Sequence, residues 1–517
     1  MKTAGQIYKE GDFVTNLSED QRFNRNKWTY TVPGIGRDMS YTLFANFLLS
    51  YVLFTRSITT EQFTVISIIL TAARIWDAIN DPVMGGIIEN TRTKVGKFKP
   101  WIIIGALLNA GVLIYTFSNR IEGWNFVIAF GICYFFWDIT FTMNDIGYWS
   151  MLPSLTSDPQ KRDKLTSFAN LFAGIGAIAA MGLIPIFTNG TSAIGGNSIS
   201  GYRAVAIFIA LAFAFSQVIV FFFVKENKSI HLEKEEHIGL GKMVKVIFRN
   251  DQLLWVTLIM LLYNIGSALL TAFGVNYMYL SFGYNGTYVT MFVAFYAFAS
   301  VAINILYPKL AAKMTRKKMS NLAIITTVIG YALFFVFGTV LPSISAPIPV
   351  QLVMLCVEAF IVGFGQSLFY MITTICLTNT IEYNEYKTGS RDEAIIFSLR
   401  PFMAKMGSAL QQVIIMVAYI AIGMTKITNG ISEVEKKASL KQISEAAKTA
   451  QIKTILDNAP SDIKLWLRFC MVAAPIILIT AAYTVMRKKV KIDEKEYDKM
   501  LFEIETRKGL PEDEKAF

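Results

Sequence analysis

Long apolar runs recur along the whole of this chain and are separated by short polar loops. Each run holds about 20 residues or more, and a helix of that length crosses the roughly 30 Å hydrocarbon core of a bilayer. Hydrophobic residues make up 53% of the 517 residues and charged residues only 17%, whereas about 25% of an average soluble protein is charged. The runs therefore predict an all-α membrane protein. We place twelve transmembrane helices at about residues 28–55, 61–90, 101–118, 123–152, 166–188, 203–224, 251–280, 287–312, 320–341, 349–381, 393–425 and 464–486.

The second half of the chain repeats the plan of the first. The basic loop 313–318 stands where residues 90–100 stand in the first half, and residues 386–392 correspond to residues 158–164, with an Arg-Asp pair in each. Two pseudo-symmetric six-helix bundles, related by an axis along the membrane normal, are typical of the major-facilitator fold. The predicted organisation is an N-terminal segment (1–27), a first bundle (28–224), a middle linker (225–250), a second bundle (251–486) with an insert (426–463), and a tail (487–517).

The basic residues are dispersed over the short loops. Lys and Arg number 49 against 38 Asp and Glu, which gives a net charge of +11. A charge spread in this way indicates a lipid bilayer as the partner and argues against nucleic acid. The positive-inside rule places the basic loops and both termini in the cytoplasm, for a multi-pass protein of the cell (cytoplasmic) membrane. The first forty residues are polar and rich in acids, so we expect no signal peptide. The insert is predicted to be an amphipathic helix on the outer side.

Cysteine and histidine do not indicate an enzyme. The four cysteines lie in apolar runs without paired spacing, so we expect neither disulfides nor a metal centre of cysteines. Both histidines lie in the middle linker. Because the spans carry no paired metal-ligand motif, we predict no enzymatic activity and no cofactor other than a coupling ion.

The most constrained polar stretch is Arg74-Ile-Trp-Asp-Ala-Ile-Asn-Asp-Pro82, which lies inside the second apolar run. Asp77, Asn80 and Asp81 share one helical face, and Arg74 lies one turn earlier, near enough to pair. Carboxylates in hydrocarbon are costly, and a bound sodium ion or proton relieves the repulsion between two of them. The pattern therefore favours a monovalent cation site in a carrier. The alternative interpretation is an ion-pair network that locks helices together.

Span four carries a second polar face. Asp138, Thr142, Asp145 and Trp149 recur there at helical spacing. Carboxylates accept several hydroxyl hydrogen bonds and an aromatic ring packs on a sugar, so the face suits a polyhydroxylated ligand. Trp149 by itself is equally compatible with an interfacial anchor. Other polar residues inside the spans are Arg37, Asp38, Asn264, Gln366, Tyr370, Thr373, Arg400 and Lys405.

Two motifs carry a resemblance to a known family. Residues 73–82 and Gly96-Lys-Phe-Lys-Pro-Trp101 are similar to the signature of the glycoside–pentoside–hexuronide cation symporters, above all to their sodium-coupled, melibiose-transporting members. The resemblance covers about residues 28–487 and implies a sugar carrier with a coupling cation. The residues that it implies are Asp77, Asn80, Asp81 and Thr142 for the cation, Arg37, Asp38, Asp145 and Trp149 for the sugar, and Lys405 near the cation site. We assign Arg74 and Lys405 to the coupling of the two ligands.

The chain departs from the family pattern at four positions. A fifth-span arginine and a tenth-span tryptophan of the family's sugar site correspond here to Asn170 and Tyr370. Asp138 and Arg400 stand where we expect small or neutral residues. We assign all four to a rebuilt substrate pocket, so galactoside specificity does not carry over. One hypothesis makes Asp138 and Arg400 a gating ion pair between the halves, and another lets Arg400 bind a substrate carboxylate.

The sequence as a whole predicts symport of a sugar or glycoside with Na⁺ by alternating access, carried out by a monomer. H⁺ and Li⁺ are the alternative coupling ions. The alternative functions are a proton-coupled hexuronide or oligosaccharide carrier, a lysolipid carrier of the same fold, and a sugar sensor that does not transport.

Overall fold

The computed structural model describes residues 19–156, 158–225 and 240–509, and these residues form helices without any β-strand. Twelve long helices form two groups of six. The first group is α2 (Gly34–Thr55), α3 (Thr60–Asn90), α4 (Lys99–Ser118), α5 (Gly123–Met151), α6 (Pro159–Thr188) and α7 (Ser198–Phe223). The second is α9 (Asp251–Phe282), α10 (Gly286–Ala311), α11 (Arg316–Ser343), α12 (Ile348–Thr388), α13 (Glu393–Ile422) and α16 (Ser461–Lys489). The shorter helices are α1 (Glu19–Thr31), α8 (Leu240–Arg249), α14 (Met424–Ser439), α15 (Glu445–Asp457) and α17 (Glu494–Gly509).

Parts of three predicted segments lie outside the described residues. These parts are residues 1–18 of the N-terminal segment, 226–239 of the middle linker and 510–517 of the tail.

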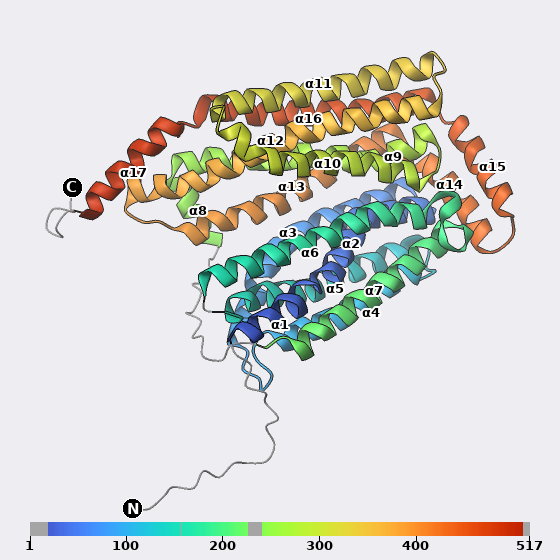
Figure 1. Cartoon of the computed structure of the whole chain (residues 1–517). Helices are drawn as coiled ribbons and strands as arrows, with labels where there is room; N and C mark the ends of the chain where they lie inside the picture. Colours follow the sequence, from blue (N-terminus) through green and yellow to red (C-terminus); the bar gives the residue numbers. More distant parts are fainter. Residues whose placement is uncertain (1–18, 157, 226–239, 510–517) are drawn as a thin grey trace, which may run out of the picture.

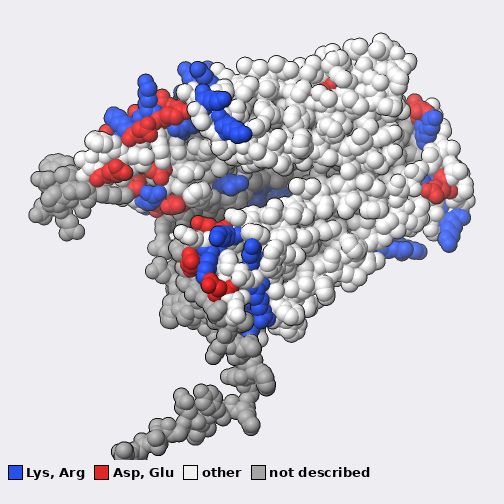
Figure 2. Space-filling view, viewed as in Figure 1, with Lys and Arg blue, Asp and Glu red and all other residues white. Residues whose placement is uncertain are grey.

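By length and hydropathy, ten of the described helices could cross a membrane, or eleven if the two parts of α3 count as one span. The remaining long helix, α2, has 22 residues and carries Arg37 and Asp38. Figure 2 shows charged side chains gathered at two ends of the molecule, with a broad uncharged band between them. Such a band is what a bilayer-spanning protein presents to lipid.

Helix α3 bends by 41° between Asp77 and Ile79. Pro82 lies inside this helix and has no N–H to donate to the carbonyl of the residue four positions earlier, which is residue 78. The bend therefore falls within the predicted cation motif, where loosened backbone and acidic side chains occur together.

The two groups of six pack in the same way. α2 lies against α6 and α7, as α9 lies against α13 and α16. α4 contacts α5 and α7, as α11 contacts α12 and α16. The two halves meet through equivalent helix pairs, α3 with α13 and α6 with α10. This internal repetition agrees with the matching basic loops, and the predicted all-α major-facilitator fold is confirmed.

The halves converge at one end of the molecule and diverge at the other (Figure 1). We call the convergent end, which carries α14 and α15, the insert end. The opposite end, which carries α1 and α17, is the terminal end. Figure 2 shows a hollow between the halves with Lys and Arg side chains inside it. The molecule is thus closed at the insert end and open at the terminal end.

Close backbone contact seals the insert end. A Cβ atom on Gly286, the first residue of α10, would overlap the carbonyl of Pro185 in α6. One turn further along, the hydroxyl of Thr290 donates to the carbonyl of Gly182 at 2.5 Å. A residue without a side chain is needed where two backbones approach this closely.

Two predicted elements differ from the structure. The predicted first span, 28–55, is broken, because α1 ends at Thr31 and α2 begins at Gly34. Pro33 explains the break, since the residue before a proline is disfavoured in helical conformation. The insert, predicted as one helix, consists of α14 and α15, and Lys441 between them has a φ of 57°.

Candidate functional site

Arg37 of α2 organises the first cluster of charged residues. Its Nη2 atom lies 2.7 Å from Asp38 Oδ2, and its Nη1 atom lies 3.3 Å from Asp145 Oδ1 in α5. Arg37 is only 3% exposed, whereas the side chains of Asp38 and Asp145 are 23% and 34% exposed. The guanidinium thus links α2 to α5 and leaves part of each carboxylate accessible to a ligand.

Aromatic rings fix the same guanidinium from its other sides. The Arg37 Cζ atom lies 4.5 Å from the ring centre of Tyr148 and 4.8 Å from that of Trp149, a favourable cation–π geometry. Tyr148 stacks on Tyr30 with ring centres 4.3 Å apart. The two hydroxyls donate reciprocally to each other's backbone carbonyls at 2.7 and 2.6 Å. Arg37, Asp38, Asp145 and Trp149, which the sequence assigns to the sugar, therefore lie together.

Lys405 of α13 lies among the acids of the α3 motif. Its Nζ atom is 3.1 Å from Asp77 Oδ1 and donates to Asp81 Oδ2 at close range. It also lies 3.5 Å from the backbone carbonyl of Asp77. These contacts join the second half of the molecule to the first, and an ammonium group stands between the two carboxylates that the sequence assigns to a cation.

Asp138 of α5, which the sequence assigns to the substrate pocket, contacts this second cluster. It is 3% exposed, and its Oδ2 atom accepts a hydrogen bond from Asn80 Nδ2 at 3.4 Å. Its carboxyl group also interacts with that of Asp77. The predicted ion pair with Arg400 does not occur in this structure, because Asp138 faces α3 within its own half of the molecule.

Arg400 faces a separate cavity in the second half. Its Nε atom donates to the hydroxyl of Tyr370 at 2.9 Å. The cavity has a volume of about 340 Å³. Its lining consists of Met260, Asn264, Tyr370, Arg400, Pro401 and Ala404. No carboxylate in the described part of the chain lies within ion-pair distance of Arg400, so its cationic side chain is available to a ligand in the cavity.

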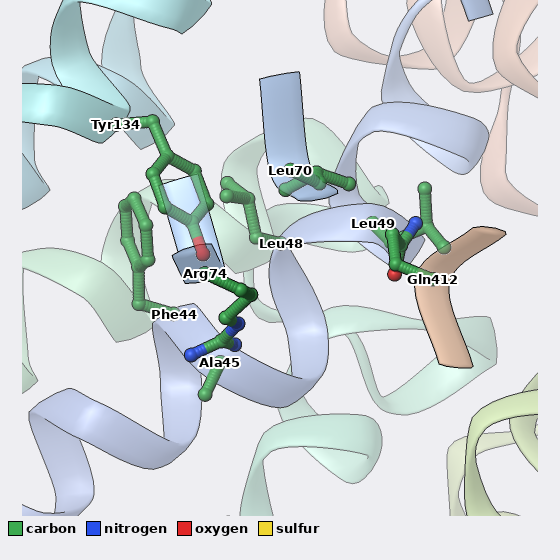
Figure 3. Close-up of a pocket in the computed structure, with 8 residues that line it drawn as sticks. All are labelled: Phe44, Ala45, Leu48, Leu49, Leu70, Arg74, Tyr134 and Gln412. Atoms are coloured by element: carbon green, nitrogen blue, oxygen red, sulfur yellow. The ribbon is translucent and has the colours of Figure 1, made fainter. Parts of the chain in front are cut away.

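The predicted pairing of Arg74 with Asp77 is not formed either. Figure 3 shows the Arg74 guanidinium beside Phe44 and the hydroxyl of Tyr134, in a small pocket that Gln412 of α13 also lines. Arg74 is also hydrogen-bonded to Tyr41. Lys405 takes the place next to Asp77 that the sequence assigned to Arg74, and the arginine turns to phenol groups instead.

Two further predicted residues form no hydrogen bond to the charged side chains of either cluster within the described part of the chain. Thr142 is 3% exposed, but within the described residues its hydroxyl makes no hydrogen bond to the acids of α3. Asn170 is exposed and donates to the carbonyl of Thr166 in its own helix at 3.0 Å. The structure therefore does not add either side chain to the contacts of the site.

The sequence reasoning missed the aromatic support beneath Arg37. Tyr30 lies in α1, near the start of the predicted first span, and Tyr148 lies one residue before Trp149. Neither position shows a periodic signal that would join them. Only the packing of α1 on the first bundle brings the two rings together.

Comparison with known proteins decides the family. A family model described as MFS/sugar transport protein matches residues 29–494. The chain belongs to this sugar transport family. The match supports the glycoside–pentoside–hexuronide symporters that the motifs indicate, within the major facilitator superfamily. Because the family consists of transporters, the prediction that the chain is not an enzyme is confirmed.

Relatives within the sugar transport family are moderately similar. The lactose permease of Lactobacillus delbrueckii subsp. bulgaricus is 26% identical, over 94% of this chain and 73% of its own length. The raffinose carrier protein of Pediococcus pentosaceus is 27% identical, over 78% of this chain. That match spans 64% of the raffinose carrier, just under two thirds of its length.

Solved structures share the fold. A bacterial homologue of the human lysosomal transporter Spinster, in an inward-facing and unoccupied conformation, superposes with a TM-score of 0.62 at 11% identity. The match covers 92% of this chain and 98% of that protein. At this identity the likeness concerns the fold alone.

Proposed function

We propose that the protein is a secondary active transporter that carries a sugar or glycoside together with Na⁺ across the cell membrane by alternating access. It acts as a monomer and needs no cofactor other than the coupling ion. The terminal end, with its basic loops and both termini, faces the cytoplasm under the positive-inside rule. The structure then corresponds to a carrier that is open to the cytoplasm.

The observation that carries this proposal is the position of Lys405 between Asp77 and Asp81. The ammonium group of Lys405 is itself a monovalent cation, and it lies between the two carboxylates. A sodium ion that enters the site replaces the ammonium group and takes over the neutralisation of the two carboxylates. The exchange also breaks the ion pairs between α13 and α3, so ion binding acts directly on the interface between the halves.

The sugar binds beside the ion, at Asp38, Asp145 and Trp149. The two partly exposed carboxylates accept hydroxyl hydrogen bonds, and the indole ring packs on the apolar face of a pyranose. The relatives are named for lactose and raffinose, which supports a neutral glycoside as substrate. We call Arg37, Asp38, Asp145 and Trp149 the sugar cluster, and Asp77, Asn80, Asp81, Asp138 and Lys405 the cation cluster. Because Asp145 and Asp138 lie on one helix, α5 connects the two clusters.

The test is the sodium dependence of sugar binding to the purified protein. Asp77→Asn and Asp81→Asn are expected to abolish the stimulation of sugar binding by Na⁺. The matched control is Glu61→Gln, which changes an exposed acid in the first turn of the same helix. Sodium stimulation that persists in both aspartate variants refutes the cation assignment.

Counterflow in proteoliposomes separates the remaining alternatives. Sugar exchange that needs Na⁺ supports sodium coupling, and exchange that follows a pH gradient without Na⁺ supports proton coupling. Protein that binds sugar but never accumulates it behaves as a sensor.

A second candidate substrate is a sugar that carries a carboxylate. The specific observation is Arg400, whose guanidinium faces a cavity and has a phenol as its hydrogen-bond partner. A bidentate arginine–carboxylate contact would fit this position. Arg400→Gln should then weaken the uptake of a hexuronide and leave the uptake of a neutral glycoside unchanged.

A further inference from the structure

The insert belongs to the second half in sequence but packs on the first half. α13 precedes it and α16 follows it, yet α14 lies against α2 and α7. The buried face of α14 consists of Met424, Thr425, Ile427, Thr428, Ile431, Ser432, Val434 and Glu435. The insert therefore crosses the interface between the halves at the end where the molecule is closed.

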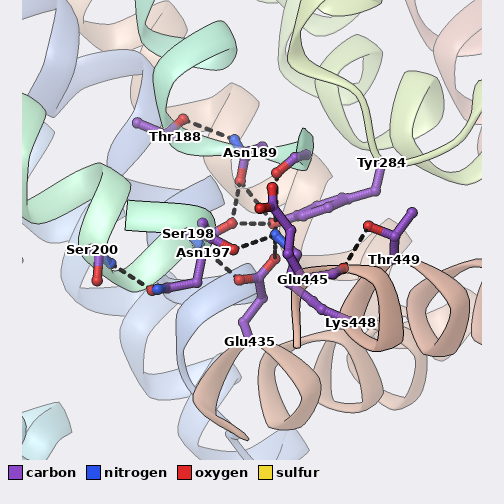
Figure 4. A network of polar contacts seen from close by, with 12 residues as sticks. Thr188, Asn189, Asn197, Ser198, Ser200, Tyr284, Glu435, Glu445, Lys448 and Thr449 are labelled. Carbon is purple, nitrogen blue, oxygen red and sulfur yellow. Dashed lines mark hydrogen bonds and ion pairs between the residues drawn. The ribbon is translucent and has the colours of Figure 1, made fainter. Parts of the chain in front are cut away.

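Two fully enclosed charges attach the insert to the loop between α6 and α7. Glu435 of α14 and Lys448 of α15 are 0% and 1% exposed and lie 3.9 Å apart. Glu435 Oε2 accepts a hydrogen bond from the backbone N–H of Ser198 at 2.7 Å. Lys448 Nζ donates to the carbonyls of Gly190 and Gly196 at 3.2 and 2.7 Å. Figure 4 shows both side chains directed at this loop.

The same loop is held by the second half through tyrosines. The Tyr284 hydroxyl donates to Asn189 Oδ1 at 2.7 Å, and Asn189 Nδ2 donates to the Tyr279 hydroxyl at 2.8 Å. The Ser198 hydroxyl also donates to Asn189 Oδ1, at 3.0 Å. Figure 4 shows Asn189, Ser198 and Tyr284 in one continuous network with Glu435.

A second attachment lies on the loop between α2 and α3. Asn429 of α14 accepts from the backbone N–H of Ile58 at 3.0 Å and donates to the carbonyl of Ile58 at 2.8 Å. The hydroxyls of Ser57 and Ser432 lie 3.0 Å apart. The side chain of Asn429 thus pairs with both the N–H and the carbonyl of Ile58, as the backbone of a neighbouring β-strand would.

We propose that α14 and α15 form a latch that holds the insert end closed and must release the first half in every transport cycle. The inference rests on the proposed alternating access, because only a carrier whose insert end opens needs such a release. In the closed state, Glu435 and Lys448 depend on loops of the first half for their partners. Loss of either charged side chain leaves the other one buried and unpaired, which is strongly unfavourable.

A reversible crosslink tests the latch. Ser57→Cys combined with Ser432→Cys places two thiols where two hydroxyls now lie 3.0 Å apart. Oxidation is expected to stop sugar uptake in proteoliposomes, and reduction is expected to restore it. Uptake that continues at the same rate in the fully crosslinked protein overturns the proposal, because the insert would then move with the first half throughout the cycle.

A labelling experiment gives a readout that does not depend on transport. Ser432→Cys places a reporter thiol on the buried face of α14, at a position that is 1% exposed. Adding Lys448→Met should raise its rate of labelling by a membrane-impermeant maleimide about tenfold or more. The matched control is Lys436→Met, which removes an ion pair of 2.5 Å between the insert and Glu122 of the first half. Both side chains of this pair are exposed, so it contributes little and the labelling rate should stay unchanged.

The two experiments separate failure of the latch from failure of the proposed function. Reduced double-cysteine protein that takes up no sugar contradicts the proposed transport, and the labelling rates then decide the latch alone. Equal labelling rates in Lys448→Met and Lys436→Met overturn the latch even if the protein transports normally.

Discussion

At the scale of single residues, two cations of the candidate site are each shared between two carboxylates. Arg37 forms ion pairs with Asp38 and Asp145, and Lys405 forms ion pairs with Asp77 and Asp81. Asp138 differs, because its hydrogen-bond partner is the amide of Asn80. Since an unpaired charge in a membrane interior is costly, this arrangement makes the two cations the parts of the site that cannot be replaced by neutral residues without consequence.

Removal of the Lys405 charge is expected to stop sugar accumulation. Lys405→Met leaves the partly buried carboxylates of Asp77 and Asp81 without a counter-charge and removes their ion pairs with α13, and an unpaired charge inside a membrane protein is costly. We expect uptake in proteoliposomes to fall at least about tenfold. Lys405→Arg keeps the charge and should retain a measurable fraction of the activity. Normal uptake by Lys405→Met would show that the ammonium group has no part in coupling.

At the scale of helices, single proline and glycine residues determine where a helix bends, where it ends and where it contacts its neighbour. Pro82 bends α3 beside Asp77, Pro33 separates α1 from α2, and Gly286 lets α10 meet α6 backbone to backbone. The break at Pro33 could have been predicted from the sequence, although the predicted first span ran through it. The role of Gly286 could not, because it depends on which helix of the other half lies opposite.

A methyl group at Gly286 is expected to destabilise the closed insert end. Gly286→Ala would place a Cβ atom into the carbonyl of Pro185, and overpacking of this kind typically costs about 1–3 kcal/mol. The apparent Tm of the purified protein should fall. The control is Gly174→Ala in α6, where a Cβ atom would meet nothing within 4 Å. Equal Tm values for the two variants would contradict the tight contact between α6 and α10.

The docking of α17 is expected to depend on pH. The backbone N–H of Arg316 donates to Glu494 Oε1 at 2.6 Å. Burial raises the pKa of Glu494, but the hydrogen bonds and charge of Arg316 outweigh this effect and hold the pKa below its ordinary value of 4.5. The stabilisation is therefore fully present above the ordinary pKa and is lost as the pH falls through the lowered one.

A fluorophore on α17 can follow this release. Its anisotropy should fall as the pH is lowered from about 6 to about 3. Glu494→Gln should remove the pH dependence, whereas Glu505→Gln, which changes an exposed acid of the same helix, should preserve it. An acid-induced change that survives in Glu494→Gln would place the responsible group elsewhere.

At the scale of the whole molecule, the sequence predicted the fold class and which acidic side chains share one helical face. Apolar runs and matching loops indicated two bundles of six, and helical spacing placed Asp77 with Asp81. The partners across helices were harder. Asp138 and Arg400 were paired by charge alone, but charge does not say which way a helix is rotated, and the structure turns Asp138 toward Asn80. The insert illustrates the same limit, because its buried ion pair depends on loops far away in sequence.

Because the cation and sugar clusters share α5, their binding is expected to be reciprocal. The factor by which Na⁺ raises the affinity for sugar must equal the factor by which sugar raises the affinity for Na⁺, since both derive from one coupling free energy. Couplings of this kind are typically about 1–3 kcal/mol, or roughly 5–150-fold. Titration calorimetry of each ligand with and without the other measures both factors. In Asp81→Asn the two factors should fall together toward one, because the cation cluster loses one of its carboxylates together with that group's ion pair to Lys405. A sodium-independent sugar affinity in the unmodified protein would separate the two clusters and leave the sugar site without an ion partner.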